Sequence, residues 1–225
     1  MAAIKYLFAG VMFLLVMNLC SCTKYQYIDT GKANGVHECT MWEYFHTDSY
    51  NWDSTILMIE RAGLRPLFDG TGQYKQITFF GLTNLSIERH IQNHNKRLQP
   101  TDKTYWHGVN DIPVSECKDI LEKLVVPVRF MLDDVPEGQR VQGVEDGVAV
   151  WLERDGMVCQ CVRGSLFVWT VKEAFGGVED AGAAVLYMAS RNMNGTAAER
   201  VASTNIQTDN GVVHALNYDF RFVNF

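Results

Sequence analysis

Residues 203–216 read STNIQTDNGVVHAL, and this stretch says most about the fold. Apolar and β-branched residues stand on both sides of the turn signal DNG at 209–211, which predicts two strands joined by a hairpin. We expect Asn210 and Gly211 to supply the positive-φ backbone of that turn. His214 lies on the final strand, where we expect a buried imidazole with hydrogen-bond partners and a structural role.

A second informative stretch reads ITFFGLTN and occupies residues 77–84. Its Ile, Thr and Phe residues predict a strand over 76–82. Thr83 and Asn84 then predict the cap of a helix that continues over 85–98, because short polar side chains satisfy the free N–H groups of a first turn.

Two further helices are predicted from apolar residues that recur every three or four positions. The first covers 40–62, with an interruption around 48–52, and Gly63 is its expected stop. The second covers 113–124, and Ser115 is its expected cap.

From residue 125 onward the sequence consists of short β-type segments separated by turn signals. The turn signal ERDG at 153–156 is expected to close a hairpin. Helices early in the chain and strands late in it predict an α+β fold rather than a βαβ repeat. The strands are expected over 125–132, 148–153, 157–163, 183–190, 198–206 and 212–223.

The first 22 residues have the features of an export signal. Lys5 precedes an apolar run that is too short for a comfortable membrane span. The following Leu-Cys-Ser-Cys resembles a bacterial lipobox, in which Cys22 fits the lipidated position better than Cys20. A signal anchor that stays uncleaved is the alternative. We therefore expect a signal peptide at 1–21 and a tether at 22–37 that begins with the lipidated cysteine.

The composition limits the class of partner. The chain has 225 residues, of which 47% are hydrophobic and 20% charged, as in an ordinary globular protein. It carries 20 Lys and Arg against 26 Asp and Glu, a net charge of −6, and has no long basic run. Nucleic acid is therefore not an expected partner, since affinity for its backbone depends on Lys and Arg.

Both informative stretches resemble signatures of the fasciclin-like domain family. ITFFGLTN is similar to the first signature and STNIQTDNGVVHAL to the second, which is the more specific of the two. The residues at signature positions, for which we expect a structural role, are Thr83, Asn84, Asn210, Gly211 and His214.

The resemblance covers residues 38–225 and includes the opening helix. It implies a single domain, a wedge of β-strands with helices packed at the N-terminal half, and insertions between 128 and 198. One motif departs from the family. The segment LEKLVVP lies where the family has a helix that ends in Tyr-His, and here Lys123 and Leu124 take those two positions.

The family resemblance and the lipobox together suggest a function. They imply a lipoprotein of the outer membrane, expected at the cell surface, in which a fasciclin-like domain mediates non-catalytic adhesion or ligand binding. The expected partners are an extracellular protein or glycan, together with the membrane through the lipid anchor. The alternative is an accessory glycan-binding component of an outer-membrane polysaccharide-uptake system. An unrecognised enzyme is the third reading.

A search for chemistry in the sequence finds no catalytic motif, and no cofactor or metal is expected. His90 and His94 have the i, i+4 spacing of metal ligands but lack the Glu of the zinc-protease motif, so a solvated helix face is the simpler reading. Cys159 and Cys161 alternate on a predicted strand without a second pair to complete a zinc site. The sequence leaves open whether a disulfide forms among Cys39, Cys117, Cys159 and Cys161.

Aromatic residues supply the best candidates for a binding surface. Tyr105, Trp106 and His107 lie between two predicted helices, in a polar segment of sequence with little apolar periodicity. We expect this loop to project and Trp106 to offer an exposed ring to a ligand. The alternative is that the indole packs against the loop or the core. The segment Asp53-Ser54-Thr55 also resembles a bacterial O-glycosylation acceptor.

Overall fold

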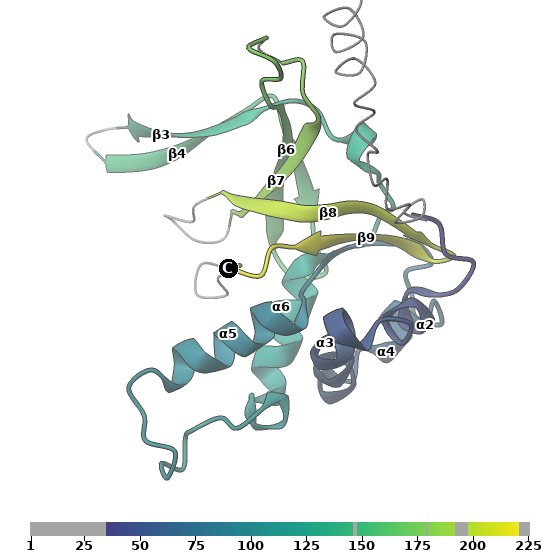
Figure 1. Ribbon diagram of the computed structural model, residues 1–225, viewed down its shortest axis with the longest axis vertical. Coiled ribbons are helices and arrows are strands. Elements are labelled where there is room, and N and C mark those ends of the chain that lie inside the picture. Colours follow the sequence, from purple (N-terminus) through teal and green to yellow (C-terminus); the bar gives the residue numbers. More distant parts are fainter. Residues whose placement is uncertain (1–34, 146–147, 179, 192–197, 221–225) are drawn as a thin grey trace, which may run out of the picture. The chain divides into compact units, whose positions relative to one another are not determined.

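The computed structural model describes residues 35–145, 148–178, 180–191 and 198–220, so the predicted leader and Cys22 lie outside it. The described residues form an α+β arrangement with most helices ahead of most strands, as predicted (Figure 1). The helices are α2 (Met41–Phe45), α3 (Ser49–Ala62), α4 (Arg65–Phe68), α5 (Asn84–Asn95) and α6 (Val114–Leu124), with 3₁₀ turns η1 (Val109–Asp111) and η2 (Leu132–Asp134). The strands are β1 (Ile77–Gly81), β2 (Val125–Val126), β3 (Gln139–Glu145), β4 (Val148–Arg154), β5 (Met157–Gln160), β6 (Ser165–Lys172), β7 (Ala184–Ser190), β8 (Glu199–Thr208) and β9 (Gly211–Leu216).

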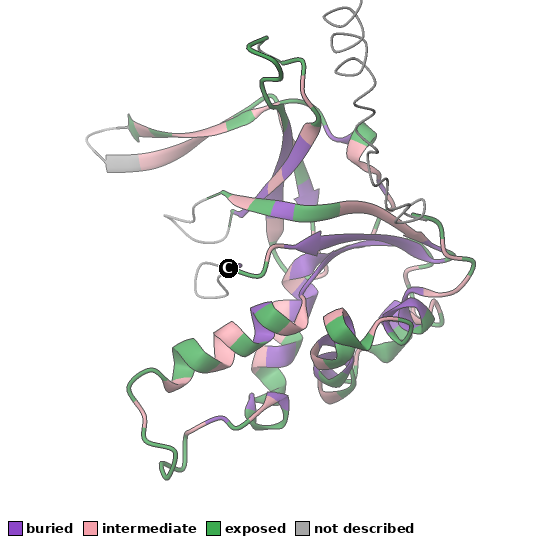
Figure 2. Cartoon of the chain, viewed as in Figure 1, coloured by how far each residue is buried: buried purple, intermediate pink, exposed green. Residues whose placement is uncertain are grey.

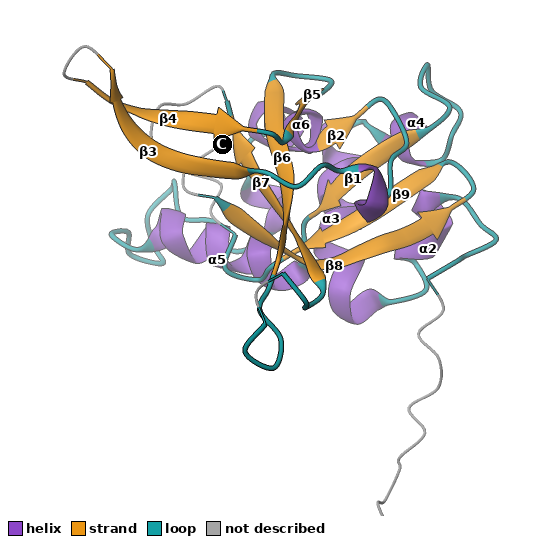
Figure 3. Ribbon diagram, turned by 90° about the horizontal axis from the view of Figure 1, so that it is seen from above, coloured by secondary structure: helices purple, strands orange, loops and turns teal. Residues whose placement is uncertain are grey.

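The described strands form one main sheet and one separate ribbon (Figure 3). In the main sheet the order is β2-β1-β9-β8-β7-β6-β5. Strand β1 runs parallel to β9, with Ile77 opposite Gly211 and Gly81 opposite Ala215, and the other neighbours are antiparallel. The two sequence stretches that resemble the family signatures are therefore neighbours in the sheet. Strands β3 and β4 pair only with each other.

Helices cover the sheet around β1 and β9, and the core lies between these layers. Every residue of β9 is buried, as the uninterrupted purple strand in Figure 2 shows. Aromatic rings fill the space between the first helices and β1: the ring centroids of Phe45 and Trp52 are 5.0 Å apart, and those of Phe68 and Phe79 are also 5.0 Å apart. Such rings bury large apolar areas and dominate the energetics of a core.

The predicted helix over 40–62 is two helices, α2 and α3, and the break precedes the predicted one. Thr40 begins α2 with a capping box, in which its hydroxyl accepts from the N–H of Glu43 and that carboxylate accepts from the N–H of Thr40. Asp48 caps α3 by accepting from the N–H of Asn51. Gly63 ends α3 at φ 68°, as predicted.

Two predictions near α6 are wrong. Ser115 lies inside the first turn, and Pro113 holds the cap position without a side-chain hydrogen bond. Proline has no side-chain acceptor, so it leaves the first N–H groups of the helix without a side-chain cap. The strand predicted over 125–132 contains only Val125 and Val126, since Pro127 cannot donate to a neighbouring strand.

The β-rich half contains two strands that the sequence did not predict, β3 and β6. Five consecutive residues of β6, from Leu166 to Thr170, are buried, so the strand has none of the polar alternation that marks a half-exposed strand. The turn at 153–156 does not close a hairpin of its flanking strands. It connects β4, which pairs with β3, to β5, which pairs with β6.

Within the described part of the chain, no helix is both long enough and apolar enough to cross a membrane.

Candidate functional site

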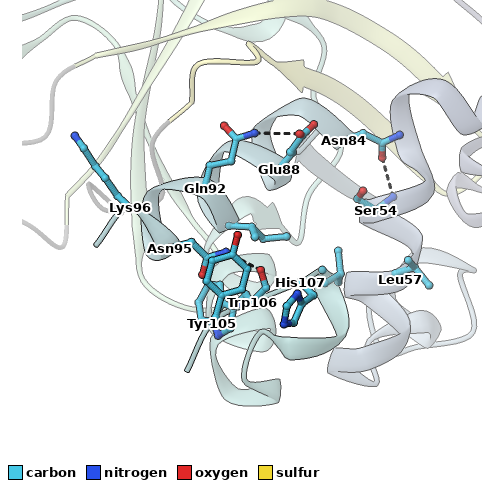
Figure 4. A pocket seen from close by; sticks show the side chains of 13 residues that line it. Ser54, Leu57, Asn84, Glu88, Gln92, Asn95, Lys96, Tyr105, Trp106 and His107 are labelled. Carbon is cyan, nitrogen blue, oxygen red and sulfur yellow. Dashed lines mark hydrogen bonds between the residues drawn. The ribbon is translucent and has the colours of Figure 1, made fainter. Parts of the chain in front are cut away.

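A groove of about 770 Å³ lies between α3, α5 and the loop that follows α5 (Figure 4). This volume is in the range of small-ligand sites. Its wall combines amide, charged, aromatic and aliphatic side chains. The lining residues are Ser54, Leu57, Asn84, Glu88, Ile91, Gln92, Asn95, Lys96, Tyr105, Trp106, His107, Gly108 and Val109.

Helix α5 supplies the polar side of the groove. Glu88, Gln92 and Lys96 follow one another at intervals of four residues, which places them along one stripe that runs from the middle of α5 to its C-cap. All three side chains are exposed, and Nε2 of Gln92 donates to Oε1 of Glu88 over 3.0 Å. The stripe therefore presents a carboxylate, an amide and an ammonium group in order.

Asn84 joins the two helices that border the groove. Its Oδ1 accepts from the N–H of Ser54 over 2.7 Å, and its Nδ2 donates to the carbonyls of Ser49 (2.9 Å) and Tyr50 (2.7 Å). The carboxamide thus hydrogen-bonds to the carbonyl of Tyr50 and to the N–H of Ser54, the two groups that an i, i+4 bond of α3 joins. The prediction that Asn84 caps its own helix is wrong, because the amide is used on α3 instead.

Thr83 does hold the N-cap position of α5, as predicted, but its hydroxyl bonds no backbone N–H of the helix. Its Oγ1 lies 3.1 Å from Oγ of Ser86, which is itself buried. The Thr83 hydroxyl therefore pairs with another hydroxyl group and leaves the first N–H groups of α5 without a side-chain cap.

Trp106 is buried, with 7% of its surface exposed, so the expectation of an exposed ring is wrong. Its indole stacks on the imidazole of His94, with ring centroids 3.5 Å apart. Nδ2 of Asn95 donates to the backbone carbonyl of Trp106 (2.6 Å), and the backbone N–H of Trp106 donates to Oδ1 of Asn95 (2.9 Å). Only part of the indole therefore borders the groove, while Tyr105 is half-buried and His107 is exposed there.

His90 and His94 serve this packing, which explains their spacing. Nε2 of His90 lies 2.9 Å from Oε1 of Glu116, and Nε2 of His94 lies 2.9 Å from the carbonyl oxygen of Thr104. Both rings contact Trp106. Burial lowers the pKa of His90, and the carboxylate of Glu116 opposes that shift. Among the described residues no three His, Cys, Asp or Glu side chains are grouped to hold a metal ion.

Asn210 and Gly211 are both structural residues. Gly211 has the predicted positive φ, at 159°, whereas Asn210 is not among the described residues with a positive φ. A Cβ at Gly211 would overlap the carbonyl oxygen of Ile77 on the neighbouring strand. Asn210 accepts from the N–H of Met41 (2.7 Å) and donates to the carbonyl of Phe68 (2.8 Å), which fixes α2 and α4 to the hairpin.

His214 is fully buried on β9, in agreement with the prediction. Its Nδ1 accepts from the N–H of Asn205 over 3.3 Å, and the rings of Phe80 and Phe130 each lie 5.7 Å away. Burial lowers the pKa of His214 to about 4, and the backbone of Phe130 acts in the opposite direction. The imidazole is not part of the groove lining and packs in the core.

The four described cysteines are free thiols. Burial raises the pKa of Cys159 to about 11 and that of Cys161 to about 12, which makes both poor nucleophiles. The predicted glycosylation acceptor lies within α3, where the Thr55 hydroxyl is buried and donates to the carbonyl of Leu82. Ser54 is its only half-exposed hydroxyl.

Comparison with known proteins identifies the fold. No family model matches the sequence, and no curated protein matches it. A solved FAS1 domain pair from the insect cell adhesion molecule fasciclin I is similar in structure, with a TM-score of 0.51 and 12% sequence identity. The match covers 83% of this chain and 52% of that structure, so the chain spans about half of its length. The fold is the fasciclin-like α+β fold.

Proposed function

We propose that this fasciclin-like chain is a non-catalytic binding domain of the adhesion type and that the groove beside α5 is its contact surface. This proposal is supported mainly by the walls of the groove, which are held in place by contacts within the chain. The carboxamide of Asn84 hydrogen-bonds to α3, and that of Asn95 hydrogen-bonds to the backbone of Trp106. Glu88, Gln92 and His107 remain exposed at the rim, where a ligand can reach them.

The chemistry of the lining favours binding over turnover. It contains one carboxylate, Glu88, and one imidazole, His107. Both groups are exposed to solvent, whereas the acid and base of an enzyme usually occupy two different environments that separate their roles. The similar FAS1 pair comes from a cell adhesion molecule, which adds support for the adhesion class.

We also propose that the chain is a lipoprotein held at the outer membrane, facing the cell surface, through Cys22. The sequence features of residues 1–22 support this part of the proposal. Replacing Cys22 with Ser should abolish lipid labelling and release the protein from membranes, whereas Cys20→Ser should leave both unchanged. Lipid labelling that depends on Cys20 instead would contradict the assignment.

Attachment of protein-coated beads tests the binding function. Beads that carry the purified protein should adhere to surfaces coated with extracellular protein or polysaccharide, and Leu57→Glu should abolish that adhesion. Leu57 lies in the groove wall and is 43% exposed, so a charge there blocks the groove without disturbing the core.

The matched control is Leu85→Glu. Leu85 is similarly exposed, at 51%, but lies outside the groove lining. Adhesion that survives Leu57→Glu, or that both variants abolish equally, would rule out the groove as the contact surface.

A further inference from the structure

The proposed function leaves the class of ligand open, and the geometry of the groove narrows it. We infer that the groove binds a neutral oligosaccharide that lies along α5. This inference rests on the proposed function of the groove. It depends on four properties of the lining: the spacing of its polar groups, its charge, the apolar contact on its loop side, and the absence of the features by which peptides are bound.

The polar groups on α5 repeat at a regular interval. Glu88, Gln92 and Lys96 are each four residues apart, which corresponds to a rise of about 6 Å per step along the helix. That step is comparable to the length of one pyranose residue in a linear chain. Successive sugars could therefore each meet one side chain able to accept from or donate to a hydroxyl group.

The charge of the lining favours an uncharged ligand. Glu88 and Lys96 carry opposite charges and cancel, and the lining contains no arginine. An anionic ligand would meet the carboxylate of Glu88, and a cationic one would meet the ammonium group of Lys96. Hydroxyl groups, which both donate and accept, suit all three positions of the stripe.

The loop side of the groove adds apolar contact. Tyr105 and His107 lie below the α5 stripe in Figure 4, and their ring centroids are 4.9 Å apart. Leu57 and Ile91 extend this surface. A sugar ring has both polar edges and C–H faces, so it can bond to α5 while its C–H face rests on an aromatic or aliphatic surface.

The common modes of peptide recognition do not fit this groove. Adding a peptide strand requires an open sheet edge, but the lining residues come from helices and a loop. Binding an amphipathic helix requires an apolar groove, whereas Glu88, Gln92 and Lys96 stand along this one. Phosphopeptide recognition depends on clustered arginines, and the lining has none.

The test is a titration of the isotope-labelled protein with four neutral trisaccharides, maltotriose, cellotriose, mannotriose and triacetylchitotriose, followed by NMR. At least one should shift the side-chain amide signals of Gln92 and the indole N–H signal of Trp106. Gln92→Ala should raise the Kd for that sugar about tenfold. Asn93→Ala is the matched control, because Asn93 is an exposed amide next in sequence that does not line the groove, and it should leave Kd unchanged.

Each remaining outcome separates this inference from the proposed function. If no trisaccharide shifts these signals while bead adhesion still depends on Leu57, the saccharide inference is wrong and the binding function stands. If a sugar binds and Gln92→Ala weakens that binding, but bead adhesion is unchanged by Leu57→Glu, the saccharide inference stands and the adhesion function is wrong.

Discussion

The imidazole of His94 lies parallel to the indole of Trp106, with ring planes 1° apart and centroids 3.5 Å apart. The stacked pair fixes the loop after α5 to the last turn of that helix, and Asn95 adds two hydrogen bonds to the Trp106 backbone. One wall of the groove thus depends on a contact between a helix and the loop that follows it. This arrangement determines what substitutions in the loop should do.

Trp106→Ala should destabilise the protein by about 3–5 kcal/mol, because it removes a buried indole and leaves a cavity beside His94. Urea denaturation monitored by circular dichroism measures this change. His107→Ala, at the exposed neighbour, should alter the free energy of unfolding by less than about 0.5 kcal/mol. Equal stability of the Trp106 variant and the parent would mean that the indole is exposed after all.

Gly211→Ala should cost about 1–3 kcal/mol, since the added methyl group overlaps the carbonyl oxygen of Ile77. Gly108→Ala is the matched control, because no atom lies within 4 Å of the Cβ position there and its φ of −178° suits alanine. Thermal unfolding of the two variants should therefore differ clearly. Similar melting temperatures would contradict the close approach of β1 to β9.

Asn210→Ala should lower the free energy of unfolding by about 1–3 kcal/mol, because the N–H of Met41 and the carbonyl of Phe68 both lose a buried partner. Asn210→Asp separates the two bonds. A carboxylate can still accept from Met41 but cannot donate to Phe68, so this variant should also be less stable than the parent. If Asp proves as stabilising as Asn in chemical denaturation, the bond to Phe68 contributes nothing.

His214 should make stability depend on pH between about 4 and 6.5. Its pKa is about 4 in the folded protein and near 6.5 when unfolded, so within this window the unfolded chain binds more protons. Stability is full above 6.5 and falls as the pH drops towards 4, by roughly 3 kcal/mol in total. Denaturation at several pH values, compared between the parent and His214→Asn, measures the difference.

The variant should be less stable overall, but its stability should fall less over that pH window. His90 also has a lowered pKa and contributes in the same direction, but it is present in both proteins and cancels in the comparison. Parallel pH profiles for the two proteins would show that His214 does not titrate as a buried imidazole.

The sequence predicts the centre of the fold well because local patterns mark it. The strand predicted over 76–82 and the hairpin around 209–211 combine β-branched residues with turn signals, and both form, the strand over Ile77–Gly81. The helix stop at Gly63 is equally local. These features depend on residues close together in the chain, which is the range over which periodicity and turn chemistry are informative.

The wall of the groove could not be predicted in this way because it depends on pairs that local patterns do not connect. Trp106 lies in a polar stretch of sequence, and only the turn of the chain after α5 brings its indole onto His94. Asn84 looks like a helix cap until α3 is placed beside it. The i, i+4 histidines ahead of a tryptophan were a usable signal, since contact of both imidazoles with one indole explains their spacing without a metal.

The entry of the chain into the domain has a mechanical consequence. The N–H of His37 donates to the carbonyl of Gln207 (2.9 Å), and the N–H of Gln207 donates to the carbonyl of Gly35 (2.7 Å). The next contacts along the chain reach the same hairpin, from Asp209 to Cys39 and from Met41 to Asn210. Tension applied ahead of Gly35 would therefore be borne first by its bonds to β8 and then by those to the β8–β9 turn. These bonds would break one after another before any load reached α3 and α5, the helices that border the groove.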